Sequence, residues 1–204
     1  YSSYYAAKGG FPHSFVMVNT QPYHLGVLSA LPLQVFGQHG PPTFQRGLLH
    51  VFIEVLELHV FVAHLHAHDA KMRTKESEEI VRIMQPLLAN NSRVLLMGDM
   101  NTLSPLDRLH HEEIKLVETL QRHQPSVWPR LGKKFLKEDD HGSIDYKPME
   151  LLLQAGFIDS CTESCRIRSK IKKDGSGGVK LWSFHGNDAF SVCVKSTCPA
   201  TEPT

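Results

Sequence analysis

Residues 94–105 read Val-Leu-Leu-Met-Gly-Asp-Met-Asn-Thr-Leu-Ser-Pro. The four apolar residues predict a buried β-strand, and the residues after them are typical of the turn that ends one. Asp99 and Asn101 are two positions apart, so their side chains face the same way in an extended or turn-like backbone. An aspartate can take a proton from water or bind a cation, and an asparagine can donate to an anionic oxygen. The segment therefore fits an active site at a strand end, although an ordinary turn has the same residues.

A second stretch favours the active site over the turn. Residues 58–65 alternate as in a strand, and His-Leu-His-Ala-His-Asp follows at 64–69. A helix that contains Arg73 and Glu76 comes next, and we expect these two side chains to tie the helix to neighbouring loops.

The apolar pattern and the turn residues predict the order of elements along the chain. Strands are expected at about 14–19, 24–29, 47–55, 58–65 and 93–98, and helices at about 74–88 and 105–121. Thr74 is expected to cap the first of these helices. Ser104, which Pro105 follows, is expected to cap the second. Pro148 is expected to start a short third helix that Gly156 ends.

The order of strand, His-Leu, Arg-containing helix, apolar strand and Gly-Asp-x-Asn resembles the endonuclease/exonuclease/phosphatase superfamily, which includes DNase I-like nucleases, sphingomyelinases and inositol phosphatases. Residues 26–33, Gly-Val-Leu-Ser-Ala-Leu-Pro-Leu, look like that family's Gly-x-x-Leu-Ser-x-x-Pro strand, and 47–55 fits the strand that follows. The resemblance covers about residues 10–160. It implies an α/β fold, a DNase I-like sandwich of two packed mixed β-sheets with outer helices.

The resemblance also implies an enzyme, a Mg²⁺-dependent hydrolase (with Mn²⁺ as the alternative ion) in which an activated water attacks a phosphodiester or phosphomonoester. By this resemblance Asp99 would bind the metal and orient or deprotonate the water. Asn101 would hold a phosphate oxygen, and His64 would donate to the phosphate or the leaving group. The substrate stays open between nucleic acid, a phospholipid headgroup and a nucleotide.

Two motifs of the superfamily are absent from the chain: an early Gln-Glu, whose glutamate ligates Mg²⁺, and a late Ser-Asp-His. In one interpretation the chain is a fragment, incomplete at both ends. In the other it is a catalytically dead binding or scaffold domain of the same fold. Both predict weak activity for these 204 residues, and the Pro-rich end favours the fragment.

The histidines at 64, 66 and 68 allow a second alternative, a zinc hydrolase. In an extended backbone His64, His66 and His68 would place their imidazoles on one face, as metal ligands do. The pattern is similar to the His-x-His-x-Asp-His of metallo-β-lactamase-like hydrolases, with the last two residues transposed. In the preferred family only His64 is expected to be catalytic, and the other two would lie at the rim of the site.

The composition predicts a single, partial domain over residues 1–204. With 22 basic and 21 acidic residues the chain has no overall field that would attract nucleic acid or membranes. The polar stretch 122–146 is expected to be a surface loop. No run of about 18 apolar residues occurs, which excludes a transmembrane helix in this stretch.

The region 161–204 combines cysteines with a basic hairpin. Disulfides are favoured over free thiols and over zinc, and with the sequon at 90–92 they favour an extracellular or secretory location. The basic residues of the hairpin, at 166–173, are expected to be solvated, although they are also suited to phosphate contacts. The cysteines are Cys161, Cys165, Cys193 and Cys198.

Overall fold

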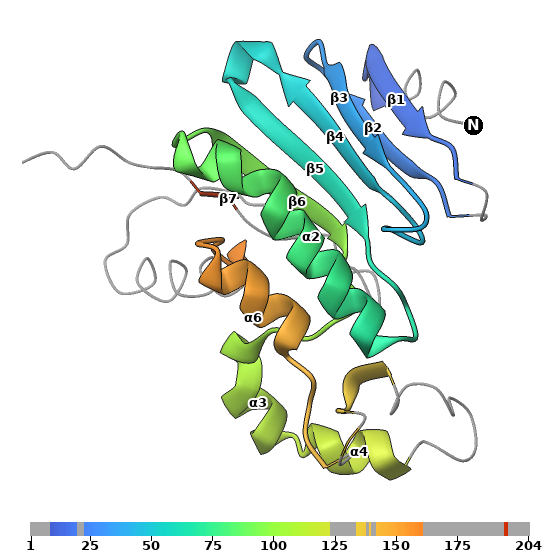
Figure 1. Cartoon of the computed structure of the whole chain (residues 1–204), viewed down its shortest axis with the longest axis vertical. Coiled ribbons are helices and arrows are strands. Elements are labelled where there is room, and N and C mark those ends of the chain that lie inside the picture. Colours follow the sequence, from blue (N-terminus) through green and yellow to red (C-terminus); the bar gives the residue numbers. More distant parts are fainter. Residues whose placement is uncertain are drawn as a thin grey trace, which may run out of the picture.

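The strands form two β-sheets (Figure 1). The computed structural model describes residues 9–19, 23–122, 134–137, 139, 142–160 and 194–195. The smaller sheet pairs β1 (His13–Met17) antiparallel with β2 (Leu25–Ser29). The larger sheet contains, in this order, β3 (Gln34–His39), β4 (Leu48–Ile53), β5 (Leu58–His64), β6 (Arg93–Asp99) and β7 (Val194–Lys195). It is mixed, because β5 and β6 run parallel whereas the other neighbours run antiparallel.

The helices that lie against the larger sheet are α2 and α6 (Figure 1). Helix α2 (Ala70–Ala89) makes the crossover between the parallel strands β5 and β6, and α6 (Lys147–Gln154) packs beside it. After β6 come the 3-10 turn η2 (Pro105–Asp107) and the short helices α3 (Arg108–Glu113) and α4 (Leu116–Arg122). A second 3-10 turn, η1 (Glu54–Leu56), joins β4 to β5.

The larger sheet buries both of its faces, because successive side chains of a strand point to opposite sides. On one face Phe61 of β5 packs with Ile80 of α2 in a core that α6 also joins. On the other face Leu49 and Val60 pack against Met17 and Leu25 of the smaller sheet. The predicted α/β sandwich of two packed sheets with outer helices is therefore confirmed, with an antiparallel smaller sheet.

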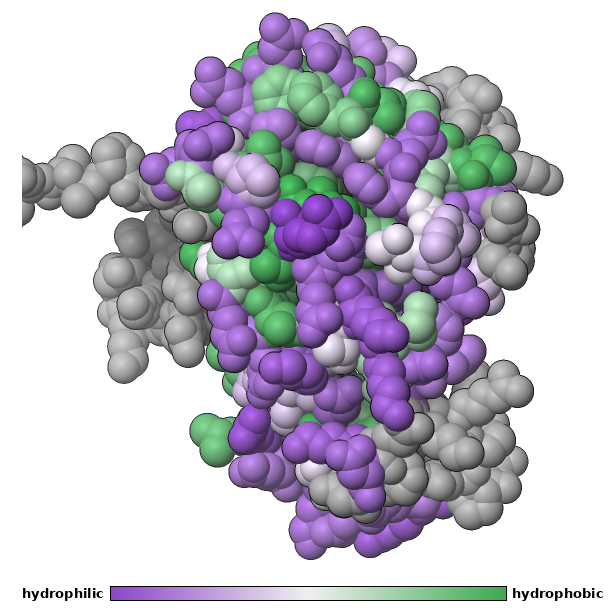
Figure 2. All heavy atoms as spheres, viewed as in Figure 1, coloured by the Kyte–Doolittle hydropathy of each residue, from purple (hydrophilic) through white to green (hydrophobic). Residues whose placement is uncertain are grey.

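The surface on the α2 side is largely hydrophilic. Figure 2 shows hydrophilic residues over most of this face, with hydrophobic residues emerging in the upper part and in smaller areas through the middle. Within the described residues, no helix combines the length and the apolar character that crossing a membrane requires.

The first turn of α2 corrects the predicted start of this helix. The helix begins at Ala70, and Asp69 is its cap, accepting a hydrogen bond of 3.0 Å from the amide of Met72. Thr74 instead lies inside the helix, where its hydroxyl donates to the carbonyl of Ala70 at 3.0 Å. The prediction of Thr74 as the cap was wrong because Asp69, a stronger capping residue, precedes it.

Two other elements differ from the predicted pattern. Strand β3 was not predicted, and it is an edge strand with a register shift between Val35 and Gly37. The single helix expected over 105–121 is divided into η2, α3 and α4. Between α3 and α4, Lys115 takes a positive φ of 51°, which ends the helical run there. The predicted cap at Ser104 is confirmed, since its hydroxyl accepts from the amide of Leu106 at 3.4 Å.

Part of the stretch expected to be a surface loop is packed. Leu136 and Ile144 form an isolated antiparallel bridge and are buried together with Tyr146. Pro148 lies in the first turn of α6, as predicted. The four cysteines and the basic hairpin lie outside the described residues.

Candidate active site

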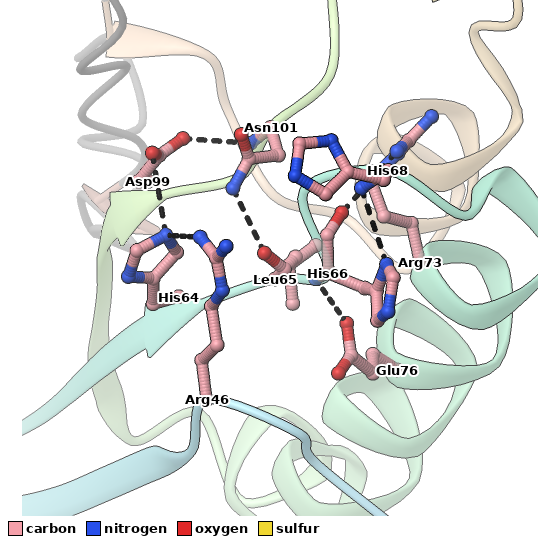
Figure 3. A network of polar contacts seen from close by, with 9 residues as sticks. All are labelled: Arg46, His64, Leu65, His66, His68, Arg73, Glu76, Asp99 and Asn101. Atoms are coloured by element: carbon pink, nitrogen blue, oxygen red, sulfur yellow. Dashed lines mark hydrogen bonds and ion pairs between the residues drawn. The ribbon is translucent and has the colours of Figure 1, made fainter. Parts of the chain in front are cut away.

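His64 and Asp99 meet at the carboxyl ends of β5 and β6. They are register partners in the parallel pair, and parallel strands end at the same edge of a sheet. Nε2 of His64 lies 3.5 Å from Oδ2 of Asp99 (Figure 3). The amide of Leu65 also donates to the carbonyl of Asp99 at 2.9 Å, which keeps the two strand ends together.

Gly98 makes this close approach possible. A Cβ at this position would lie only 1.9 Å from the carbonyl oxygen of Ala63, and the φ of Gly98 is 131°, which L-residues rarely adopt. Both observations require glycine directly before Asp99. Glycine at position 98 is therefore a structural condition for the site.

Asn101 is folded back onto the strand ends. It is 4% exposed, and its positive φ of 49° is one that asparagine tolerates better than most residues. Its side-chain amide donates to the carbonyl of Leu65 at 2.8 Å, and its backbone amide donates to Oδ1 of Asp99 at 2.9 Å. One N–H of the Asn101 side chain is thus used to hold the turn, and the predicted contact with a phosphate oxygen would use the other.

Arg46, which the sequence did not reveal as a site residue, completes the cluster. It precedes β4, and its Nη1 contacts Nε2 of His64 (Figure 3). The Arg46 guanidinium carbon lies 4.0 Å from the centroid of the Tyr23 ring, a cation–π geometry. The signal in the sequence is weak but present: Arg46 is the only lysine or arginine between Lys8 and Lys71.

The contacts of His64 indicate a neutral imidazole. Burial lowers the pKa of His64, the charges of Arg46 and Lys134 lower it further, and only the carboxylate of Asp99 raises it. Because arginine always donates, we assign Nε2 as the acceptor and place the ring hydrogen on Nδ1. The contact between His64 and Asp99 becomes an ion pair only when the ring is protonated.

Arg73 and Glu76 hold the loops around the cluster, as predicted. They are 1% and 0% exposed, respectively. The Glu76 carboxylate accepts from the amide of His66 at 2.6 Å and from that of Gln45 at 3.1 Å. Arg73 donates to the carbonyl of His66 at 3.2 Å and to that of Lys134. The first turns of α2 therefore fix the segments that carry Arg46 and His64.

The three imidazoles expected for a zinc hydrolase do not converge. Strand β5 ends at His64, so the extended backbone assumed for the three does not continue. Nδ1 of His66 accepts from the amides of His68 and Asp69, at 3.2 Å and 2.9 Å. In the described part of the chain no group of three or more His, Cys, Asp or Glu is arranged to hold a metal ion. The described residues therefore do not support the second alternative, a zinc hydrolase built on His64, His66 and His68.

The described residues around Asp99 do not fit a resident Mg²⁺ either. Magnesium is held by an octahedron of oxygens, with one or two carboxylates among them. One oxygen of Asp99 already accepts from Asn101 and the other faces His64, while Glu76 is turned to backbone amides. The positive charge of Arg46 lies next to His64 and opposes a cation there. The role of Asp99 as a metal ligand stays a prediction.

Comparison with known proteins supports the fold. No family model matches the sequence, and no curated protein matches it. The solved structure of an AP endonuclease from Archaeoglobus fulgidus matches with a TM-score of 0.56 over 95% of this chain and 70% of that chain. The two sequences are 13% identical, so the likeness concerns the fold alone. It confirms that this chain has the DNase I-like fold.

Proposed function

We propose that this chain is a phosphoesterase domain that binds a phosphate ester at the cluster of Arg46, His64, Asp99 and Asn101 and hydrolyses it with an activated water. The observation that carries the proposal is the meeting of His64 and Asp99 at the ends of parallel strands, with Arg46 beside them. Open α/β sheets bind ligands at this edge.

The residues match the needs of phosphoester hydrolysis, which are an oriented water and stabilisation of charge on the phosphoryl oxygens. Oδ2 of Asp99 would accept the proton of the attacking water, because Oδ1 is engaged by Asn101. Arg46 would stabilise the phosphoryl oxygens. His64, once protonated, can donate from Nε2 and so supply the proton that the leaving oxygen needs.

Nucleic acid is the substrate class that we favour over a phospholipid headgroup or a nucleotide. The support is the fold shared with a protein described as an AP endonuclease. Hydrolysis in this fold would use Mg²⁺ or Mn²⁺, which needs ligands beyond the described residues.

The second candidate function is a binding or scaffold domain of the same fold that has lost catalysis. The observation that favours it is the donor set. Among the described residues Asp99 is the one carboxylate of the cluster, and Arg46 adds a positive charge beside it. The two candidates differ in turnover and agree in binding phosphate esters.

Asp99→Asn tests the hydrolase. It keeps the oxygen that accepts from Asn101 and removes the charge and the base. We expect cleavage of abasic-site DNA, measured with Mg²⁺ and with Mn²⁺, to fall at least about a hundredfold, as for the loss of a general base. The matched control is Glu113→Gln, an exposed carboxylate 3.7 Å from His110, which should cleave as the native chain does. Equal cleavage by both variants would contradict the role of Asp99, and DNA binding without turnover by the native chain would favour the binding domain.

A further inference from the structure

Arg46 brings a positive charge to the site. No Asp or Glu precedes Glu54 in the chain, so no carboxylate is close to Arg46 in sequence. The ion pairs among the described residues do not include Arg46. Its partner at Nη1 is the imidazole of His64, which separates the guanidinium from the carboxylate of Asp99. Burial raises the pKa of the Glu76 carboxyl, and the charge of Arg46 is among the influences that oppose this shift.

The backbone of Arg46 is fixed from both sides. Its carbonyl accepts from the side-chain amide of Asn19, and the preceding amide of Gln45 donates to Glu76 at 3.1 Å. Gly47, which follows, has a φ of 104°, and a Cβ there would lie 3.0 Å from Cε of Met17. These contacts therefore fix the position of the Arg46 backbone.

The guanidinium itself is held on one face and at one nitrogen. The ring of Tyr23 lies under the face, and His64 takes one of the five N–H donors. Figure 3 shows the guanidinium beside His64, close to the turn of Asp99 and Asn101. The other donors remain for a ligand, and a planar fork of this kind matches two oxygens of a phosphate. A held side chain also loses little conformational entropy on binding.

We propose that Arg46, held by His64 and Tyr23, is an anchor that binds the phosphate group of the ligand without a divalent metal ion. This inference rests on the proposed function and specifies how the site takes its substrate. The reason is the donor set: the described residues offer a positive, preorganised group and do not build a metal site. Binding at this cluster therefore does not depend on Mg²⁺.

The test measures binding of two probes, inorganic phosphate by calorimetry and a short fluorescein-labelled DNA strand by polarisation. Each is measured in EDTA and again with Mg²⁺. We expect the native chain to bind the probes in EDTA. In Arg46→Ala the affinity should fall at least about tenfold, because about one charge-assisted hydrogen bond is lost. Arg46→Lys should restore part of it, since lysine keeps the charge and loses the fork. The matched control is Arg82→Ala. Arg82 lies on α2 with a side chain that is 71% exposed, and this variant should bind both probes as tightly as the native chain does.

The outcomes separate this inference from the proposed function. Binding of phosphate alone assigns a free phosphate or monoester as the ligand, and binding of DNA alone assigns a phosphodiester chain. Binding of either probe only with Mg²⁺, or equal binding by Arg46→Ala and the native chain, would overturn the inference. Arg46→Gln, which can still stack on Tyr23, replaces Arg46→Ala if thermal unfolding shows that the alanine variant is not folded. If the chain binds the probes in EDTA but does not cleave DNA, the proposed hydrolase is contradicted and the role of Arg46 in binding phosphate is not.

Discussion

Replacing Glu76 with alanine tests whether α2 holds the site together. The fully buried carboxylate accepts two hydrogen bonds, of 2.6 Å from the amide of His66 and 3.1 Å from that of Gln45. Both amides would lose their partner, and the buried guanidinium of Arg73 would lose a nearby negative charge. Removing one member of a buried charged network costs roughly 3–5 kcal/mol. At about 2–4 °C per kcal/mol for a domain of this size, the melting temperature should fall by roughly 10 °C.

Thermal and urea unfolding, followed by circular dichroism, measure this loss. Glu79→Ala is the matched control on the same helix, because Glu79 pairs with Arg82, whose side chain is 71% exposed. A surface pair of this kind contributes at most about 1 kcal/mol. If Glu76→Ala is as stable as Glu79→Ala, the two amides do not depend on this carboxylate, and the explanation of how Arg46 and His64 are positioned is refuted.

Three further predictions concern stability. Gly98→Ala should destabilise the chain by at least about 3 kcal/mol in urea unfolding, because its Cβ would meet the Ala63 carbonyl oxygen at 1.9 Å; a loss below 1 kcal/mol would contradict the geometry. Burial, and then the charges of neighbouring histidines, lowers the pKa of His50 from 6.5 to about 4. The free energy of unfolding therefore contains about 3 kcal/mol from neutral His50 above pH 6.5, and this stabilisation is lost as the pH falls to 4. His50→Phe should flatten that acid dependence of unfolding, and an unchanged pH profile would refute the assignment. Asp69→Ala should lower the free energy of unfolding by about 1 kcal/mol and Thr74→Ala by less, because Asp69 is the cap of α2. A larger loss in Thr74→Ala would instead identify Thr74 as the cap.

The strands that carry the site were predictable because their patterns are local. The apolar residues before Gly98 and the alternation that ends at His64 each specify a strand. A helix between two strands implies a parallel pair, and a parallel pair ends at one edge. The meeting of His64 and Asp99 follows from these steps, and the structure places them as register partners.

The edge strand β3 and the division of the second helix were not predictable in the same way. Gln34–His39 has exposed residues at most positions and lacks a clear apolar alternation, so its pairing with β4 defines it as a strand. Lys115 has no sequence feature that requires a positive φ, yet this φ separates α3 from α4. For β3, the pairing with β4 therefore outweighs a weak local preference.

The sequence by itself determined the DNase I-like order of elements and three residues of the candidate site, His64, Asp99 and Asn101, because strand periodicity and turn chemistry depend on neighbouring residues. Only the tertiary structure decided the surroundings of these residues. Tyr23 and Arg46 come from loops before β2 and β4, which belong to different sheets, and the packing of those sheets brings them to His64. The packing of α2 buries Glu76 against two loop amides, and Nδ1 of His66 accepts from the amides of His68 and Asp69. The described residues therefore bring a guanidinium to His64 and do not gather the three histidines into a zinc site.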